Sequence, residues 1–156
     1  MTDGRTFAAS TVALGLLALV HATVTWPLRV TTAFFVGGAA VAFLAEAVVI
    51  RLGWLEHHVG PKALGVPLYV LFGWTGVVYV AFRLALLVAD GWPAVALAAL
   101  LATGYDAVSD PRGVAEGFWS YTDDLPGPRP AGVPWWNTVG WLCISAATAG
   151  FAVLVR

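Results

Sequence analysis

The chain has 156 residues, of which 60% are hydrophobic and 11% are charged, against roughly 25% charged residues in soluble domains. A soluble domain of this length has no interior large enough for so much apolar surface, so residues 1–156 are predicted to form a single integral membrane domain. The net charge of −1 gives no field that would attract nucleic acid, and the single cysteine, Cys143, excludes an internal disulfide and a cysteine-cluster metal site.

Five apolar stretches are long enough to cross a bilayer as helices, which takes about 20 mostly apolar residues. They are residues 7–25, 31–50, 64–89, 92–107 and 135–155. Continuous apolar runs fit helices rather than the alternating strands of a barrel. We therefore predict an all-α fold, a polytopic membrane helix bundle of about five transmembrane helices. The first stretch has a second interpretation, a signal peptide with Val20 and Ala22 flanking the cleavage site.

Basic residues in the connecting segments predict how the bundle is oriented. With five spans, one side of the membrane holds Arg5, Arg51, Lys62, Arg112 and Arg129, and the other side holds Arg29 and Arg156. Basic residues near the ends of spans favour the cytoplasmic side. We therefore expect a multi-pass protein of the cell membrane with its N-terminus in the cytoplasm and its C-terminus outside.

The longest polar segment, residues 109–134, separates the last two spans. Its second half contains "DDLPGPRPAGVP", which is rich in proline and glycine and is predicted to be a loop, with Asp123 and Asp124 facing solvent. Its first half contains "PRGVAEGFWSY", residues 111–121, which is predicted to be a short helix along the membrane interface.

Glu46 is the most informative single residue, because it is embedded in the apolar run "VAFLAEAVVI". A carboxylate inside a span costs about 3 kcal/mol at the helix centre and less near the interface. Glu46 must therefore be paired, protonated or functional, and the structural alternative is an interhelical hydrogen bond. Burial favours a protonated carboxyl, which is the form that a general acid requires.

Asp106 and Asp110 are four residues apart at the end of the fourth span, so one helical face could present both. Two neighbouring carboxyls tend to hold one proton between them, as an acid and base pair does. However, Pro111 disfavours the helical conformation at Asp110, which also fits the N-cap of a helix beginning at Pro111. Asp106 is thus the better catalytic candidate, and capping remains the alternative for Asp110.

Two histidines and many aromatic residues are predicted to lie at the same end as these acids. His57 and His58 could bind a metal together with the acids, but adjacent histidines in a loop are more often solvated, and no zinc spacing is present. We therefore predict no metal. The aromatic residues fit either an interfacial belt or the lining of a site for an apolar polyene. They are Trp54, Phe118, Trp119, Tyr121, Trp135 and Trp136.

The stretch "YDAVSDPRGVAEGFWSY" followed by "GVPWWNTVGW" resembles a family of carotenoid biosynthesis membrane proteins. The family includes carotenoid 1,2-hydratases, which act on acyclic ends, and bisanhydrobacterioruberin hydratases. Glu46 and "LEHHVGPKALGVPLYVLFGW" fit the earlier half of the same family, so that the resemblance covers about residues 43–141.

The resemblance implies a hydratase that adds water to a terminal double bond of an acyclic carotenoid without a cofactor. Glu46 or Asp106 would donate the proton, Asp110 would accept one from the attacking water, and aromatic faces would stabilise the cation. The expected substrate-binding residues are Trp119, Tyr121, Trp135, Trp136, Asn137, His57 and His58. Asn137 would orient the water, and helix capping is its structural alternative.

The expected partners are a carotenoid or another isoprenoid lipid and the bilayer itself, with a homo-oligomer or a complex with other carotenoid enzymes left open. A non-catalytic carotenoid- or isoprenoid-binding membrane protein is the alternative function, because it would need the aromatic residues but not the acids. A proton or ion pathway ranks last, since polar groups do not continue through the full depth of the spans.

Overall fold

The five predicted spans are five helices in residues 3–155, which are the residues that the computed structural model describes. The helices are α1 (Gly4–Thr25), α2 (Leu28–Arg51), α3 (Leu68–Ala85), α4 (Gly91–Ala115) and α5 (Trp135–Leu154). Each is long and apolar enough to cross a membrane. The predicted all-α, multi-pass membrane bundle is therefore confirmed. Arg156, one of the predicted outer charges, lies outside the described residues.

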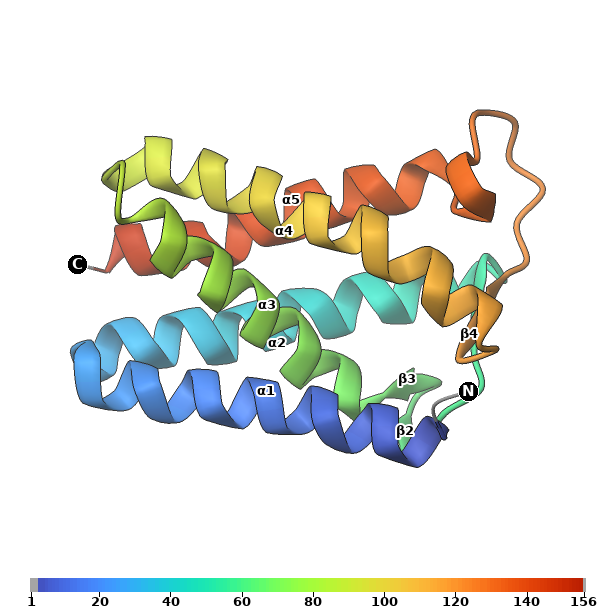
Figure 1. Ribbon diagram of the computed structural model, residues 1–156, viewed down its shortest axis with the longest axis horizontal. Coiled ribbons are helices and arrows are strands. Elements are labelled where there is room, and N and C mark those ends of the chain that lie inside the picture. The colour runs from blue at the N-terminus through green and yellow to red at the C-terminus, as the bar shows by residue number, and fades with distance from the viewer. Residues whose placement is uncertain (1–2, 156) are drawn as a thin grey trace.

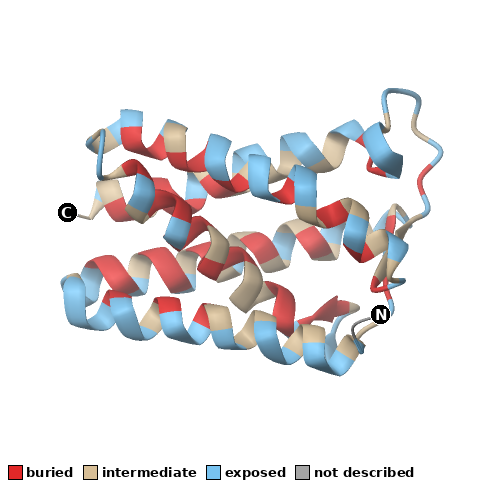
Figure 2. Ribbon diagram, in the orientation of Figure 1, coloured by how far each residue is buried: buried red, intermediate tan, exposed pale blue. Residues whose placement is uncertain are grey.

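α3 runs obliquely across the view in Figure 1, from the side of α1 to the side of α4. α3 contacts α1, α4 and α2, while α5 contacts α4 and α2. Buried positions face the centre of the bundle, and exposed positions cover its outside (Figure 2). Large apolar side chains such as Leu17, Val24 and Leu101 are among the exposed ones. In a membrane protein such side chains face the lipid tails, whose apolar surroundings make burial inside the protein unnecessary.

Small residues let neighbouring helices approach closely at two crossings. A Cβ on Gly15 of α1 would lie 2.5 Å from the carbonyl oxygen of Phe72 in α3, and a Cβ on Gly38 of α2 would lie 2.5 Å from Cγ2 of Thr148 in α5. Close backbone approach at small residues is the usual way that membrane helices associate. These contacts fix α3 against α1, and α5 against α2.

The third helix begins later than predicted. Residues 62–67 form a hairpin instead of helix, with β2 (Lys62–Ala63) paired to β3 (Val66–Pro67). The turn between these strands places Leu64 at φ 52° and Gly65 at φ 87°, which a helix cannot contain. The prediction that the span starts at residue 64 is therefore wrong.

The fourth helix continues past its predicted end at residue 107, through Asp110 and Pro111, to Ala115. Asp110 is therefore inside the helix and does not cap a new one, so the predicted alternative role for it is wrong. A proline inside a membrane helix is tolerated because neighbouring groups satisfy the backbone that it frees.

The predicted interfacial helix at residues 111–121 is also wrong. Residues 111–115 complete α4, and Gly117 at φ 75° then ends the helix. The N–H of Phe118 donates to the carbonyl of Gly113 at 2.9 Å and the N–H of Gly117 to that of Val114 at 3.0 Å, the pair of bonds typical of a glycine-terminated helix. The chain then forms a strand, β4 (Trp119–Tyr121), and later a short 3₁₀ turn, η1 (Pro130–Gly132).

β4 pairs antiparallel with β1 (Leu55–His57), with Leu55 opposite Tyr121 and His57 opposite Trp119. This pairing joins the α2–α3 connection to the α4–α5 connection. Figure 1 shows the N-terminus, β2 and β4 at one end of the bundle and the C-terminus at the other. The connections that follow α2 and α4, the helices with the predicted catalytic residues Glu46, Asp106 and Asp110, therefore meet at one end.

Candidate functional site

A cavity of about 300 Å³ lies at the end of the bundle where β1 and β4 pair. Residues from all five helices and from both of these strands line it. The volume is at the lower end of the range for ligand sites, about 300–1,000 Å³, and a mainly apolar lining with a few converging polar groups is typical of them. The polar groups form two sets.

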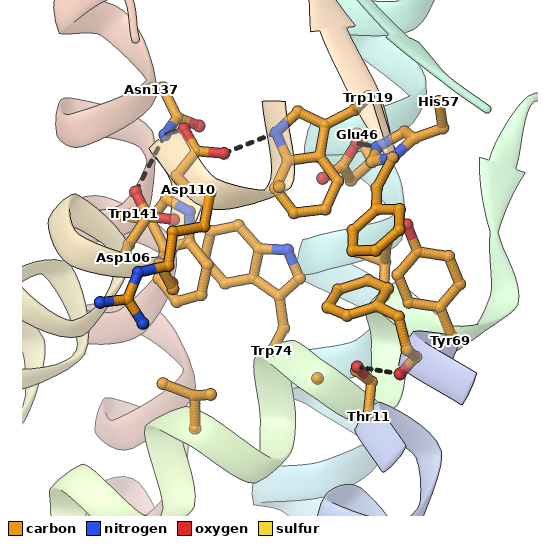
Figure 3. A pocket seen from close by; sticks show the side chains of 18 of the residues that line it. Thr11, Glu46, His57, Tyr69, Trp74, Asp106, Asp110, Trp119, Asn137 and Trp141 are labelled. Atoms are coloured by element: carbon orange, nitrogen blue, oxygen red, sulfur yellow. Dashed lines mark hydrogen bonds and ion pairs between the residues drawn. The ribbon is translucent and has the colours of Figure 1, made fainter. Parts of the chain in front are cut away.

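The first set is an acidic pair on α4, held together by an amide on α5 (Figure 3). Asp106 and Asp110 are 4% and 3% exposed, so the single face predicted from their spacing is confirmed. Asn137 donates from Nδ2 to Oδ2 of Asp106 at 2.9 Å and to Oδ2 of Asp110 at 3.2 Å. The three side chains form one buried cluster in the cavity wall.

Two side chains of β4 also bond to Asp110. Alternate residues of a strand point to the same side, so Trp119 and Tyr121 both reach the carboxylate. Trp119 Nε1 donates to Oδ1 and the Tyr121 hydroxyl donates to Oδ2, both at 2.6 Å. Burial, followed by the negative charge of Asp110, raises the pKa of the Tyr121 hydroxyl well above its usual range, so the hydroxyl remains a donor.

Asp106 and Asp110 therefore differ in how many donors they bind. Both oxygens of Asp110 accept hydrogen bonds, whereas among residues 3–155 only Asn137 donates to Asp106, at Oδ2. Bonds from three donors favour the ionised form of a carboxyl. A proton shared by the pair is thus better placed on Asp106, where Oδ1 is open.

The second set of polar groups joins Glu46 of α2 to His57 of β1. Oε2 of Glu46 lies 3.0 Å from Nε2 of His57, and the two residues are 9% and 6% exposed. The expectation that both histidines are solvated is therefore wrong for His57. His58 is exposed and bonds to Ser120 at 3.0 Å, and it is absent from the cavity lining. In the described part of the chain, no three His, Cys, Asp or Glu side chains group closely enough to hold a metal ion.

The aromatic walls of the cavity include four rings that the sequence did not indicate as part of a site, those of Phe7, Tyr69, Trp74 and Trp141. Trp74 of α3 stacks on Trp141 of α5 with ring centroids 3.7 Å apart, and Phe7 of α1 stacks on Phe118 at 4.3 Å. Tyr69 meets Phe7 edge to face at 5.4 Å. Trp141 follows Asn137 by four positions, a spacing that puts both on one helical face and could have indicated it.

Two of the predicted substrate-binding residues, Trp135 and Trp136, do not line the cavity. Trp135 is 42% exposed and its indole N–H donates to the carbonyl of Pro126. Trp136 packs against Trp54 and Tyr121, each with ring centroids 5.5 Å away. Trp136 therefore contacts the site through Tyr121. Trp135 lies on the surface at the start of α5, against the loop.

The loop between β4 and η1 contains an ion pair with a buried aspartate where solvent-facing acids were expected. Asp123 is 9% exposed and binds the guanidinium of Arg129, so its predicted exposure is wrong, while Asp124 is exposed as expected. Burial alone would raise the pKa of Asp123, but hydrogen bonds from the Arg129 side chain and the Leu125 backbone N–H hold it below its usual range.

Replacing Asp123 with asparagine is expected to lower the melting temperature at neutral pH, because the amide forms a weaker hydrogen bond with Arg129 than the carboxylate does. The folded-state pKa of Asp123 lies below its unfolded-state value of about 3.9. Its stabilisation is therefore present above that value and is lost as the pH falls through the folded-state pKa. The melting temperatures of wild type and variant in detergent should converge as the pH falls through the folded-state pKa, and a difference that stayed constant would contradict the ionic role.

Comparison with protein families gives a match over residues 7–156 to the family described as carotenoid biosynthesis protein. All residues that line the cavity lie within this match. The comparisons with curated proteins and with solved structures give no match.

Proposed function

The chain belongs to the carotenoid biosynthesis protein family, and from this premise we propose that it hydrates a terminal C=C bond of an acyclic carotenoid. Family membership supports a role in carotenoid biosynthesis. The reaction and its site are our proposal, and the observation that carries them is the buried Asp106–Asn137–Asp110 cluster in the wall of an aromatic cavity. Such a cavity combines an apolar place for an isoprenoid end with the groups that acid-catalysed hydration requires.

Asp106 is the general acid in this proposal. It is buried, its Oδ1 is open, and it lies beside a carboxylate that already binds three donors. Asp106 gives its proton to the less substituted carbon of the double bond, and the positive charge then develops on the tertiary carbon. Asp110 stays ionised, and its negative charge stabilises the nearby cation.

The stacked indoles of Trp74 and Trp141 supply π faces that also stabilise this cation. A water molecule then attacks the tertiary carbon through its oxygen and loses one proton to a base in the cavity. The C=C π bond is replaced by one C–H and one C–O bond, so one alkene and one water give one tertiary alcohol. No electron is gained or lost, and Asp106 regains a proton from solvent.

The place of the cavity in the bundle suits a substrate that is dissolved in lipid. Apolar helices line most of the cavity, while β1 and β4 line it at the end of the bundle. A polyene can therefore remain in the bilayer while its reacting end meets water. From the basic residues near this end and the positive-inside rule, we infer that this end faces the cytoplasm.

The test is expression in a host that makes lycopene or another acyclic carotenoid, followed by mass analysis of the pigments. We expect products with one extra water at a reacted end. When membranes that contain the protein are given preformed, unlabelled carotenoid in D₂O, the product should also carry one non-exchangeable deuterium on the carbon next to the alcohol, because that hydrogen comes from the acid. Unchanged pigments from several acyclic substrates, with folded protein present, would leave the non-catalytic carotenoid-binding protein as the better interpretation.

A further inference from the structure

Two buried polar atoms at the cavity have no hydrogen-bond partner within residues 3–155. They are Nδ1 of His57 and the hydroxyl oxygen of Tyr69, on residues that are only 6% and 4% exposed. Both residues line the cavity. Since buried polar groups are nearly always hydrogen-bonded, two of them on one cavity indicate a polar ligand atom that binds there.

We propose that His57 and Tyr69 bind the oxygen that the reaction adds, first in the attacking water and then as the hydroxyl of the product. The inference rests on the proposed hydration and extends it by assigning the base and a subsite for a tertiary alcohol. His57 is the catalytic base in this assignment, and Glu46 is the positioning residue behind it.

The surroundings of His57 fix its ring in one orientation. Nε2 is bound to Glu46 at 3.0 Å, and Nδ1 is thereby left for the ligand. The ring meets Tyr69 edge-on, with centroids 6.4 Å apart, and Trp119 at 5.9 Å. The backbone is held as well, because His57 pairs with Trp119 across the two strands and Lys62 donates to its carbonyl. A base held in this way does not need to reorganise when the reaction begins.

The base lies apart from the acid. Figure 3 shows Asp106, Asp110 and Asn137 on one side of the view and His57 and Tyr69 on the other, with aromatic side chains between them. A double bond held between the two groups can receive the proton from one side and the oxygen from the other. The acid and the base then need not compete for one position.

In the proposed step, water donates one hydrogen to Nδ1 of His57 and the other to the Tyr69 oxygen, which leaves a lone pair for the cation. As the C–O bond forms, Nδ1 takes the first proton. Nε2 keeps its own proton, bonded to ionised Glu46, so the imidazolium is paired with a carboxylate as in other histidine–carboxylate catalytic pairs. His57 then releases its proton to solvent, and Asp106 takes one up.

The first measurement is ligand binding, which does not require turnover. Quenching of tryptophan fluorescence in detergent would compare a carotenoid tertiary alcohol with the alkene from which it derives. We expect wild type to prefer the alcohol, and His57→Gln and Tyr69→Phe each to weaken alcohol binding about tenfold, the effect of one lost hydrogen bond. Alkene binding should not change.

The second measurement is the hydration rate. His57→Gln retains an amide that can reach Glu46 but has no group that accepts a proton, so kcat should fall by about 10²- to 10⁴-fold with alkene binding unchanged. The controls are His21→Gln and Tyr79→Phe, which alter a histidine–tyrosine pair, bonded at 2.7 Å, that lies outside the cavity. Both should retain wild-type rates and the preference for the alcohol.

The two measurements separate this inference from the proposed function. Hydration by wild type together with full activity and alcohol preference in His57→Gln and Tyr69→Phe would overturn the inference alone. A wild type that prefers the alcohol through these residues but never hydrates would overturn the proposed function and support the subsite. Absence of both hydration and preference would overturn both.

Discussion

Replacing Asp106 with asparagine is expected to lower the rate of carotenoid hydration by about 10²- to 10⁴-fold, the usual contribution of a general acid. The amide has nearly the shape of the carboxyl, and its oxygen can still accept the hydrogen bond from Asn137 that Asp106 accepts at 2.9 Å. The variant should therefore fold and bind the alkene as wild type does. It lacks only the proton. Pigment analysis after co-expression, with protein amounts matched, measures the effect.

Two further variants show whether that loss is specific. Asp110→Asn replaces one carboxylate oxygen with an N–H₂ group, which then faces either the Trp119 donor at Oδ1 or the Tyr121 and Asn137 donors at Oδ2. It should therefore disturb the positions of these side chains and lower the melting temperature. Asp124→Asn changes an exposed acid in the loop and should alter neither activity nor stability. Near-normal hydration by Asp106→Asn would show that the acid is another group, with Glu46 the next candidate.

Composition and helical spacing were sufficient to predict the bundle and one half of the site. Apolar runs of membrane-spanning length predict helices because a bilayer leaves the backbone no other way to satisfy its polar groups. Asp106 and Asp110 share one helical face because residues four positions apart are neighbours on a helix surface. The same spacing puts Asn137 and Trp141 on one face of α5. The prediction of each helix and the prediction of a shared face for the two aspartates depend on one helix at a time, and neither requires knowledge of what packs against that helix.

The other half of the site depends on contacts between distant parts of the chain. His57 is buried because β1 pairs with β4, and two three-residue strands in separate connections leave too short a pattern for sequence to indicate their pairing. The effect of Pro111 also depends on tertiary packing. Considered by sequence alone, the proline favours a break in the helix, but neighbouring helices in a membrane bundle satisfy the backbone that it frees, and α4 continues to Ala115.

The sequence does not distinguish aromatic residues that form an interfacial belt from those that line a cavity, because the same residue types occur in both. Trp119 lines the cavity and bonds to Asp110, whereas Trp135 lies on the loop surface. Trp74 was overlooked because it occurs inside an apolar span, where an aromatic residue normally faces lipid or packs in the interior. Its place in the cavity wall follows from the packing of α3 against α5, where Trp74 stacks on Trp141.

Gly113→Ala is expected to reduce hydration by about 10²-fold, the effect of displacing a positioned group by about 1 Å. A Cβ at Gly113 would lie 2.1 Å from Cη2 and Cζ2 of Trp119, so the indole must move. Movement of the ring breaks the 2.6 Å bond to Asp110 and disturbs the face that Trp119 presents to His57. Gly104→Ala is the matched control on the same helix, because a Cβ there meets nothing within 4 Å.

Helix propensity cannot account for a loss in Gly113→Ala, since alanine is favoured over glycine inside a helix by up to about 1 kcal/mol at both positions. The clash can be isolated by adding Gly113→Ala to Trp119→Ala, which removes the indole. If the two residues act through one contact, the glycine substitution should cost nothing further in that background, and the two effects should not add. Additive losses would instead mean that Gly113 acts through the conformation of α4, and that the position of Trp119 at Asp110 does not depend on Gly113.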